Sequence, residues 1–250
     1  MAGARVRIRD GKVEVLTEPA IRSCPLRQDL YGIKVESKET VKRVIEEHMA
    51  ELGMYGPKRV LELEDKPVSF GASEILSDAL SEGLIDAAVL VCEGAGTVVA
   101  AKPAVLQAIG AHMTGLIRTE PIEEIQIGLE ERGCILIDRQ GTVDQVLGFE
   151  RAVEAGYRRI AVTVAGDRAD DARALRERER ALGAGATILA VHTTGISENE
   201  AQVLAECCDL VWSCASQSVR EVAGGKALMQ IGIAIPVFAL TPMGKRLILN

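Results

Sequence analysis

The sequence has few aromatic residues, few histidines and no excess of basic residues. Its 250 residues include three Phe, three Tyr, one Trp and three His. Aliphatic side chains and alanine must therefore fill most of the interior. A net charge of −7 and a pI near 5.2 argue against a protein that binds nucleic acid through a basic surface.

Long apolar runs are also missing. The longest, IGIAIPVFAL, is interrupted by Gly232 and Pro236, so it falls well short of the roughly 18 residues that a membrane-spanning helix needs. The first residues, MAGARVRIRDGKVEV, are charged and alternate in polarity, unlike the apolar segment of a signal peptide. We therefore expect a cytoplasmic protein that binds neither membrane nor nucleic acid.

The six cysteines form no CxxC pair. This spacing argues against a zinc finger or a ferredoxin-type site, which use closely spaced ligands. In a cytoplasmic protein, single cysteines are more often thiols, metal ligands or catalytic groups than disulfides.

From residue 58 onward, apolar runs that look like strands alternate with helical patterns. The expected strands are 59–64, 86–92, 134–138, 158–165, 186–192, 209–214 and 235–240. Continuous apolar strands separated by helices predict an α/β fold with a mostly parallel sheet of about six or seven strands and helices on both faces. An open sheet is favoured over a closed eightfold barrel because too few strands are present.

The first 57 residues have a different pattern. Residues 5–17 alternate in polarity around Asp10-Gly11, which predicts a β-hairpin. An irregular arm containing Cys24 follows, and then a helix from Lys38 that Gly53 closes. We expect residues 1–57 to form an appendage or small lobe and residues 58–250 to form the α/β core domain.

Ligands of parallel α/β sheets gather outside the carboxyl ends of the strands. Cys92 and Cys214 each close a predicted strand, and His192 ends another. Four polar residues are expected at the same edge: Glu93, Thr193, Thr194 and Thr241. The remaining cysteines of the core, Cys134, Cys207 and Cys208, lie near strand starts, so we expect them at the opposite edge with structural roles.

Several segments resemble the methanogenesis marker protein 8 family, from about residue 10 to the C-terminus. They are, in order, IRSCPL, SFGASEIL, GLIDAAVLVCEGAGTVV, IAVTVA, AVHTTGIS, SCAS and IPVFALT. The resemblance implies that the family pattern includes Cys24, Cys92, Cys214 and His192, which adds Cys24 to the carboxyl-edge group. It also implies a link to the anaerobic metabolism of methanogenic archaea, without naming a reaction.

Three cysteines from distant segments suit a [4Fe-4S] cluster with one open iron, or a zinc site completed by His192 or water. An open iron would act as a Lewis acid toward a small ligand. Anaerobic metabolism, as the resemblance implies it, favours the iron-sulfur cluster. We therefore expect Cys24, Cys92 and Cys214 to be metal ligands, with zinc as the alternative metal.

Two other functions fit the same residues. In a cysteine-nucleophile enzyme, Cys92 would attack, His192 would be the base and Glu93 would orient it. In a binding protein, Gly94, Gly96 and Thr97 would form an anion cradle, and Thr193 and Thr194 would offer hydroxyls. Such a protein would carry a small molecule or cofactor precursor to a protein partner, and a homodimer is compatible with the sequence.

Overall fold

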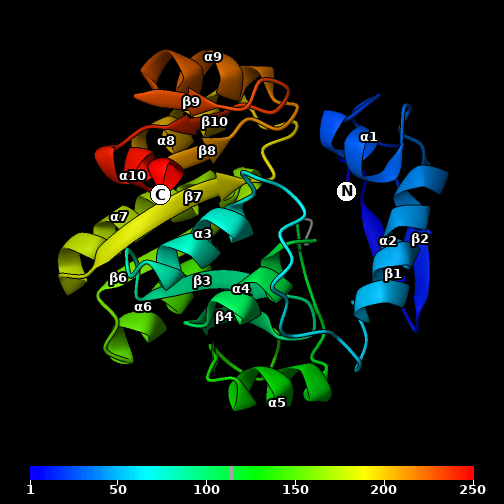
Figure 1. Ribbon diagram of the computed structural model, residues 1–250, viewed down its shortest axis with the longest axis horizontal. Coiled ribbons are helices and arrows are strands. Elements are labelled where there is room, and N and C mark those ends of the chain that lie inside the picture. The colour runs from blue at the N-terminus through cyan, green and yellow to red at the C-terminus, as the bar shows by residue number, and fades with distance from the viewer. Residues whose placement is uncertain (113–114) are drawn as a thin grey trace.

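The computed structural model describes residues 1–112 and 115–250. Figure 1 shows an N-terminal lobe (residues 1–57, blue) standing beside a larger core (residues 58–250). The lobe holds the β-hairpin β1 (Val6–Arg9) and β2 (Lys12–Val15) with helices α1 (Pro25–Tyr31) and α2 (Lys38–Leu52). The hairpin turns at Asp10 and Gly11, both at positive φ, as a two-residue turn requires.

The core is built on one eight-stranded mixed sheet. Its strands follow the order β5 (Ile135–Leu136), β4 (Gly96–Ala100), β3 (Ala87–Cys92), β6 (Arg159–Ala165), β7 (Gly185–Val191), β8 (Leu210–Trp212), β10 (Val237–Ala239) and β9 (Met229–Ile231). The four central strands β3, β6, β7 and β8 are parallel to one another. The pairs on either side of them are antiparallel.

Helices cover both faces of this sheet. One face packs against α6 (Gln145–Glu154), α7 (Ala169–Leu182), α8 (Glu198–Cys207) and α9 (Gln217–Lys226), with a short 3-10 turn, η1 (Gly166–Arg168), before α7. The other face packs against α3 (Ala72–Ser81), α4 (Pro103–Gly110), α5 (Glu123–Glu131) and α10 (Pro242–Leu249). Aliphatic side chains and alanine fill both layers, as the aromatic-poor composition predicts.

The α/β prediction is confirmed, but the sheet is less parallel than expected. Strand β4 was missed because GTVVA follows Cys92 after only a tight turn. Strand β9, Met229–Ile231, lies outside the expected strands. The predicted strand at residues 59–64 does not form; these residues are an extended connection between lobe and core. Cys24 precedes a seven-residue helix, α1, rather than lying in a wholly irregular arm.

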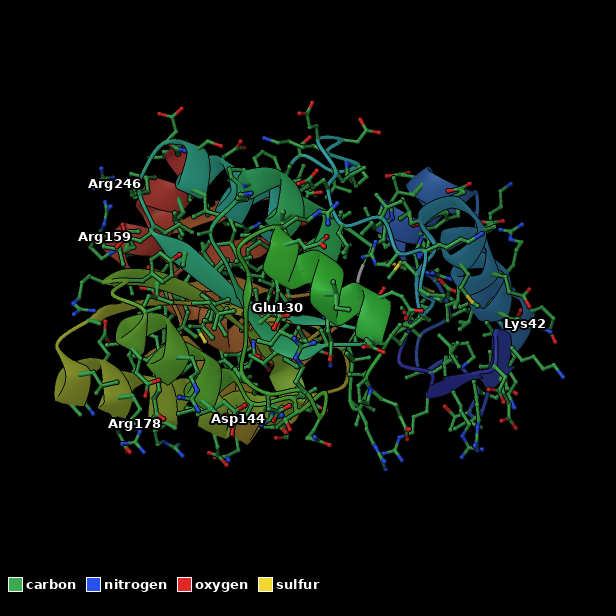
Figure 2. All side chains as sticks on the ribbon, turned by 90° about the horizontal axis from the view of Figure 1, so that it is seen from below. Lys42, Glu130, Asp144, Arg159, Arg178 and Arg246 are labelled. Carbon is green, nitrogen blue, oxygen red and sulfur yellow. The ribbon has the colours of Figure 1, made fainter. Side chains whose placement is uncertain are left out.

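The lobe lies beyond the carboxyl ends of the parallel strands. Figure 2 shows Lys42 of α2 at one end of the molecule and Arg159, where β6 begins, at the other. Strand β6 therefore runs toward the lobe. Of the helices in residues 1–112 and 115–250, none combines the length and the apolar character needed to cross a membrane.

Candidate functional site

The carboxyl edge of the sheet brings together residues from several strands. Cys92 ends β3, His192 directly follows β7, and Cys214 lies two residues after β8. Thr241 does not share this edge, and that expectation is wrong. It follows β10, which runs antiparallel to β8, so its hydroxyl reaches the amino edge and donates to Asp209 Oδ1 at 2.6 Å.

Cys214 is a half-buried free thiol in a strained backbone position. Its φ is 44°, a left-handed conformation that residues with a Cβ adopt at a cost. Burial raises the pKa of its thiol, while the backbone N–H groups of Thr193 and His192 oppose the shift because hydrogen bonds to sulfur favour the thiolate. A negative charge on Cys24 raises the pKa further.

His192 lies beside Cys214 and is also strained, with a φ of 54°. Its ring faces Gly115, where an added Cβ would come within 3.6 Å of the His192 Cγ. The residue is exposed, and the pKa of its ring is lowered from 6.5 to about 4, first by desolvation and then by the positive charge of the N-terminus. The imidazole is neutral at physiological pH, which is the form that binds metals.

Cys24 belongs to the lobe. It is the residue before α1, it has extended backbone angles, and Pro25 begins the helix after it. Its thiol is free and half-buried. The residues thus grouped, Cys24, Cys214 and His192, are called the edge site below.

The two threonines tie the loops of the edge site together. Thr193 is fully buried, and its hydroxyl donates to the carbonyl oxygen of Trp212 at 2.6 Å. Thr194 Oγ1 accepts from the backbone N–H of Ala215 at 3.5 Å. Both hydroxyls join the loop after β7 to the loop after β8, so they fix the position of Cys214.

Cys92 lies apart from the edge site. Two strands, β6 and β7, separate β3 from β8, so the two strand ends are about 14 Å apart at about 4.8 Å per strand spacing. The thiol is fully buried and lies 3.4 Å from the carbonyl oxygen of Glu93. Burial, and then the charge of Glu93, raise its pKa well above the ordinary value.

The Glu93 carboxylate pairs with an arginine that sequence reasoning missed. Arg59 Nε lies 2.6 Å from Glu93 Oε1, and each side chain is only 1% exposed. Arg59 Nη2 also donates to the carbonyl oxygen of Ala108 at 2.7 Å, and the backbone N–H of Tyr55 donates to Glu93 at 3.4 Å. No interaction with His192 is found among the described residues, so Glu93 has a structural partner instead. The only sequence signal for this ion pair was Arg59 itself, which opens the otherwise regular segment RVLELE (residues 59–64).

The glycine-flanked turn after Cys92 is occupied by neighbouring chain. The backbone N–H of Gly94 donates to Thr119 Oγ1 at 2.8 Å, and that of Thr97 donates to the carbonyl oxygen of Thr142 at 2.8 Å. A Cβ on Gly96 would lie 2.3 Å from the same Thr142 oxygen. The N–H groups of Gly94 and Thr97 therefore serve a packed β-hairpin turn here.

The edge site combines groups that bind soft metals. It consists of two thiols and a neutral imidazole. Ser213, which precedes Cys214 in the chain, is fully buried, and its hydroxyl has no hydrogen-bond partner in the described part of the chain. Within residues 1–112 and 115–250, no three His, Cys, Asp or Glu side chains are already arranged to hold a metal ion. Metal binding here therefore requires these side chains to move together, or ligands from solution to complete the site.

Comparisons with known proteins cover the whole chain. Residues 1–250 match the family described as uncharacterized protein conserved in archaea (DUF2099). The chain is also 38% identical over 252 residues to the uncharacterized protein MJ0054 of Methanocaldococcus jannaschii, across 99% of this chain and 86% of that protein. The chain therefore belongs to this archaeal family, DUF2099.

Proposed function

We propose that this protein binds a soft metal ion or a metal–sulfur cofactor at the edge site, with an open position for a small ligand. Cys24 and Cys214 supply thiolates, and His192 supplies a neutral imidazole. The observation that carries the proposal is that His192 and Cys214 follow the neighbouring parallel strands β7 and β8 at the carboxyl edge, both at positive φ. Thiolate and imidazole are the ligands that zinc and iron-sulfur centres use.

The local environment of Cys214 supports a ligand role. A metal ligand must be deprotonated, and the N–H groups of Thr193 and His192 favour the thiolate. The strained φ angles of His192 and Cys214 are further support, because strained backbone is retained where the position of a side chain matters.

The finer form of the proposal is a [4Fe-4S] cluster held by Cys24, Cys92 and Cys214. A cluster needs its thiolates around one compact centre, and Cys92 lies three strand positions from Cys214. Cys92 would therefore have to leave its buried position. The smaller form, a single metal held by two thiolates and His192, leaves Cys92 in its buried position.

We also propose that the family is the one known as methanogenesis marker protein 8, and that the ligand belongs to anaerobic metabolism. Support comes from the motifs around Cys92 and His192 and from a relative in Methanocaldococcus jannaschii. A carrier that delivers the loaded metal or a cofactor precursor to a partner protein is one role of this kind. A Cys92 nucleophile draws less support, because its thiol is buried and Glu93 is held by Arg59.

Metal analysis of matched variants tests the proposal. The protein is purified without oxygen and reconstituted with iron and sulfide or with zinc, and bound iron, labile sulfide and zinc are counted per chain. We expect Cys24→Ser and Cys214→Ser each to lose most of the metal. Cys207→Ser, a half-buried cysteine beside the amino edge, should retain it. Equal retention in all three variants would remove the edge site as the metal site.

The variant Cys92→Ser separates the two forms of the proposal. Loss of iron and labile sulfide together in this variant favours the three-cysteine cluster. Full retention of metal favours the site made by Cys24, Cys214 and His192, and His192→Ala should then weaken it.

A further inference from the structure

Two histidines from distant parts of the chain are in ring contact where the lobe meets the core. His48 lies on α2 and is 4% exposed, and His112 lies two residues beyond the end of α4. Their ring centroids are 4.8 Å apart, and the ring planes are inclined at 63°. Two imidazoles that bind one tetrahedral metal ion, with each nitrogen about 2.0–2.1 Å from it, have centroids about 5 Å apart. The two rings therefore have the spacing that a shared metal ion requires.

The hydrogen bond of His48 leaves one of its ring nitrogens free. Tyr31 Oη lies 2.9 Å from His48 Nε2. Among residues 1–112 and 115–250, His48 Nδ1 and both ring nitrogens of His112 have no hydrogen-bond partner. A histidine that binds a metal through one nitrogen commonly donates the N–H of the other to an outer acceptor. With the proton on Nε2, Tyr31 is such an acceptor, and the lone pair of Nδ1 is available.

A buried carboxylate beside the end of α4 has no counter-charge. Glu74 is 2% exposed, and its oxygens accept only from neutral donors, the Ser73 hydroxyl at 2.9 Å and Gln107 Nε2 at 3.2 Å. Gln107 is 1% exposed, and its Oε1 has no hydrogen-bond partner in the described part of the chain. Helix α3 packs closely here, because a Cβ on Gly110 would lie 2.8 Å from Ser73 Cβ. A buried charge without a counter-charge is costly, so this end of α4 favours a bound cation.

A second carboxylate follows His48 on the same helix face. Glu51 lies three residues after His48 on α2, a spacing that makes two side chains neighbours on the helix surface. It is exposed, and no basic residue in the described ranges pairs with it. Burial and then Arg59 lower the pKa of His112, and three carboxylates oppose that shift: Glu74, Glu51 and Asp65. The surroundings of the two rings are thus rich in negative charge.

The turn after α2 holds this junction in one position. The backbone N–H of Val60 donates to the carbonyl oxygen of Leu52 at 2.8 Å, and that of Gly56 donates to the carbonyl oxygen of Gly53 at 3.2 Å. Met54, inside the turn, is 1% exposed. Because the end of α2 is fixed in this way, ligands on that helix are presented to the core by a rigid element.

We propose that His48 and His112 bind a divalent transition-metal ion of the zinc type, with Glu51 as the third ligand and water in the open position. Two histidines and one glutamate are an established ligand set for zinc. Within the described residues no three such side chains are already arranged around one point, so the exposed side chain of Glu51 turns toward the rings on binding. The metal-bound water then lies in a region where Gln107 Oε1 lacks a donor. The site contains no thiol and does not rest on the edge site.

Zinc titration of a variant without the edge-site cysteines tests this site. The chain carrying both Cys24→Ser and Cys214→Ser is freed of metal and titrated with Zn²⁺ alone, and calorimetry gives the Kd and the number of ions per chain. We expect saturable binding of one ion. In this background, Tyr31→Phe should weaken binding about 10-fold to 100-fold, as loss of an outer partner does, and Glu51→Gln and His112→Asn should each weaken it by at least about 100-fold.

A matched control separates a ligand from a nearby charge. Glu46→Gln removes another exposed carboxylate of α2, one that pairs with Lys42, and it should leave the Kd for Zn²⁺ unchanged. Glu51→Gln alters only an exposed side chain, so its effect does not depend on a change of fold, and circular dichroism checks the fold of His112→Asn. If the background variant does not fold, the same comparison of Glu51→Gln with Glu46→Gln is made in the wild-type chain.

Two results would overturn the site. One is the absence of saturable Zn²⁺ binding, and the other is an equal Kd in Glu51→Gln, His112→Asn and Glu46→Gln. Neither result bears on the edge site. Its zinc count is read as the difference between Cys214→Ser and the unchanged cysteine in the His112→Asn background, so the two metal sites fail independently.

Discussion

The amino and carboxyl edges of the same sheet differ in how completely their buried polar groups are hydrogen-bonded. At the amino edge, the buried carboxylate of Asp209 lies 2.7 Å from Arg176 Nη2. It also accepts hydrogen bonds from the backbone N–H of Ile188 at 2.7 Å and from the hydroxyl of Thr241 at 2.6 Å. Both carboxylate oxygens are thus satisfied, and the start of β8 is fixed to β7 and to the last helix.

At the carboxyl edge, two residues have strained backbone angles and a buried hydroxyl lacks a hydrogen-bond partner. His192 and Cys214 have positive φ angles, and the buried Ser213 hydroxyl has no partner in the described part of the chain. Unsatisfied groups and strained residues lower stability and persist where they serve a ligand. The comparison indicates that the amino edge holds the fold together, and it makes the carboxyl edge the place where we propose the site.

The largest expected effect is the loss of the Asp209 network at the amino edge. The variant Asp209→Ala leaves Arg176 Nη2, the Ile188 N–H and the Thr241 hydroxyl without their acceptor, while Arg176 keeps its pair with Glu179. We expect the free energy of unfolding to fall by about 3–5 kcal/mol, because several buried donors lose their partner. Urea denaturation measures it. The control is Asp170→Ala, which removes the exposed pair Asp170–Arg173 and should cost less than about 1 kcal/mol. Equal losses in both variants would mean that the Asp209 network does not anchor the sheet.

A second prediction concerns the pH dependence of the lobe. The folded pKa of His48 is about 4, below its ordinary value of 6.5, so between these values the unfolded chain binds more protons than the folded one. The stability that neutral His48 contributes is complete above pH 6.5 and is lost as the pH falls toward 4. The difference corresponds to roughly 3 kcal/mol.

Matched denaturation curves isolate this contribution. Unfolding of the wild-type protein and of His48→Gln is followed at pH 7 and at pH 4.5. Carboxylates that also titrate in this range are common to both proteins, so their contributions cancel. The wild-type protein should therefore lose more stability on acidification than the variant does. Identical losses would show that His48 is not kept neutral by the fold.

Part of this arrangement could be predicted from the sequence. Apolar runs alternating with helices predicted the central parallel strands, and the carboxyl-edge positions of Cys92, His192 and Cys214 followed from the ends of those strands. The same reasoning failed for Thr241, because it assumed that every strand is parallel, whereas β10 is antiparallel. Strand direction at the borders of a sheet depends on long-range pairing, which local patterns do not encode.

The order of the strands across the sheet could not be predicted from the sequence either. Sequence reasoning grouped Cys92 with Cys214 because both end strands, but the order β3-β6-β7-β8 separates them by two intervening strands. The pairing of Glu93 with Arg59 was missed for a related reason. Residues 59–64 were assigned to a strand, and a strand assignment gave no reason to bring Arg59 to the end of β3.

The smallest expected effect sharpens the comparison at Cys214 itself. A left-handed backbone costs a residue with a Cβ about 1–2 kcal/mol, and glycine avoids that cost while adding about 0.5–1 kcal/mol of chain entropy. The variant Cys214→Gly should therefore stabilise the metal-free protein by about 0.5 kcal/mol while removing a proposed metal ligand. The matched control is Ala215→Gly, since Ala215 is not at positive φ, and it should destabilise by about the entropy term alone. Urea denaturation of both variants in the presence of a metal chelator measures this difference. If Cys214→Gly were the less stable of the two, the backbone at Cys214 would not be strained, and the carboxyl edge would be as relaxed as the amino edge.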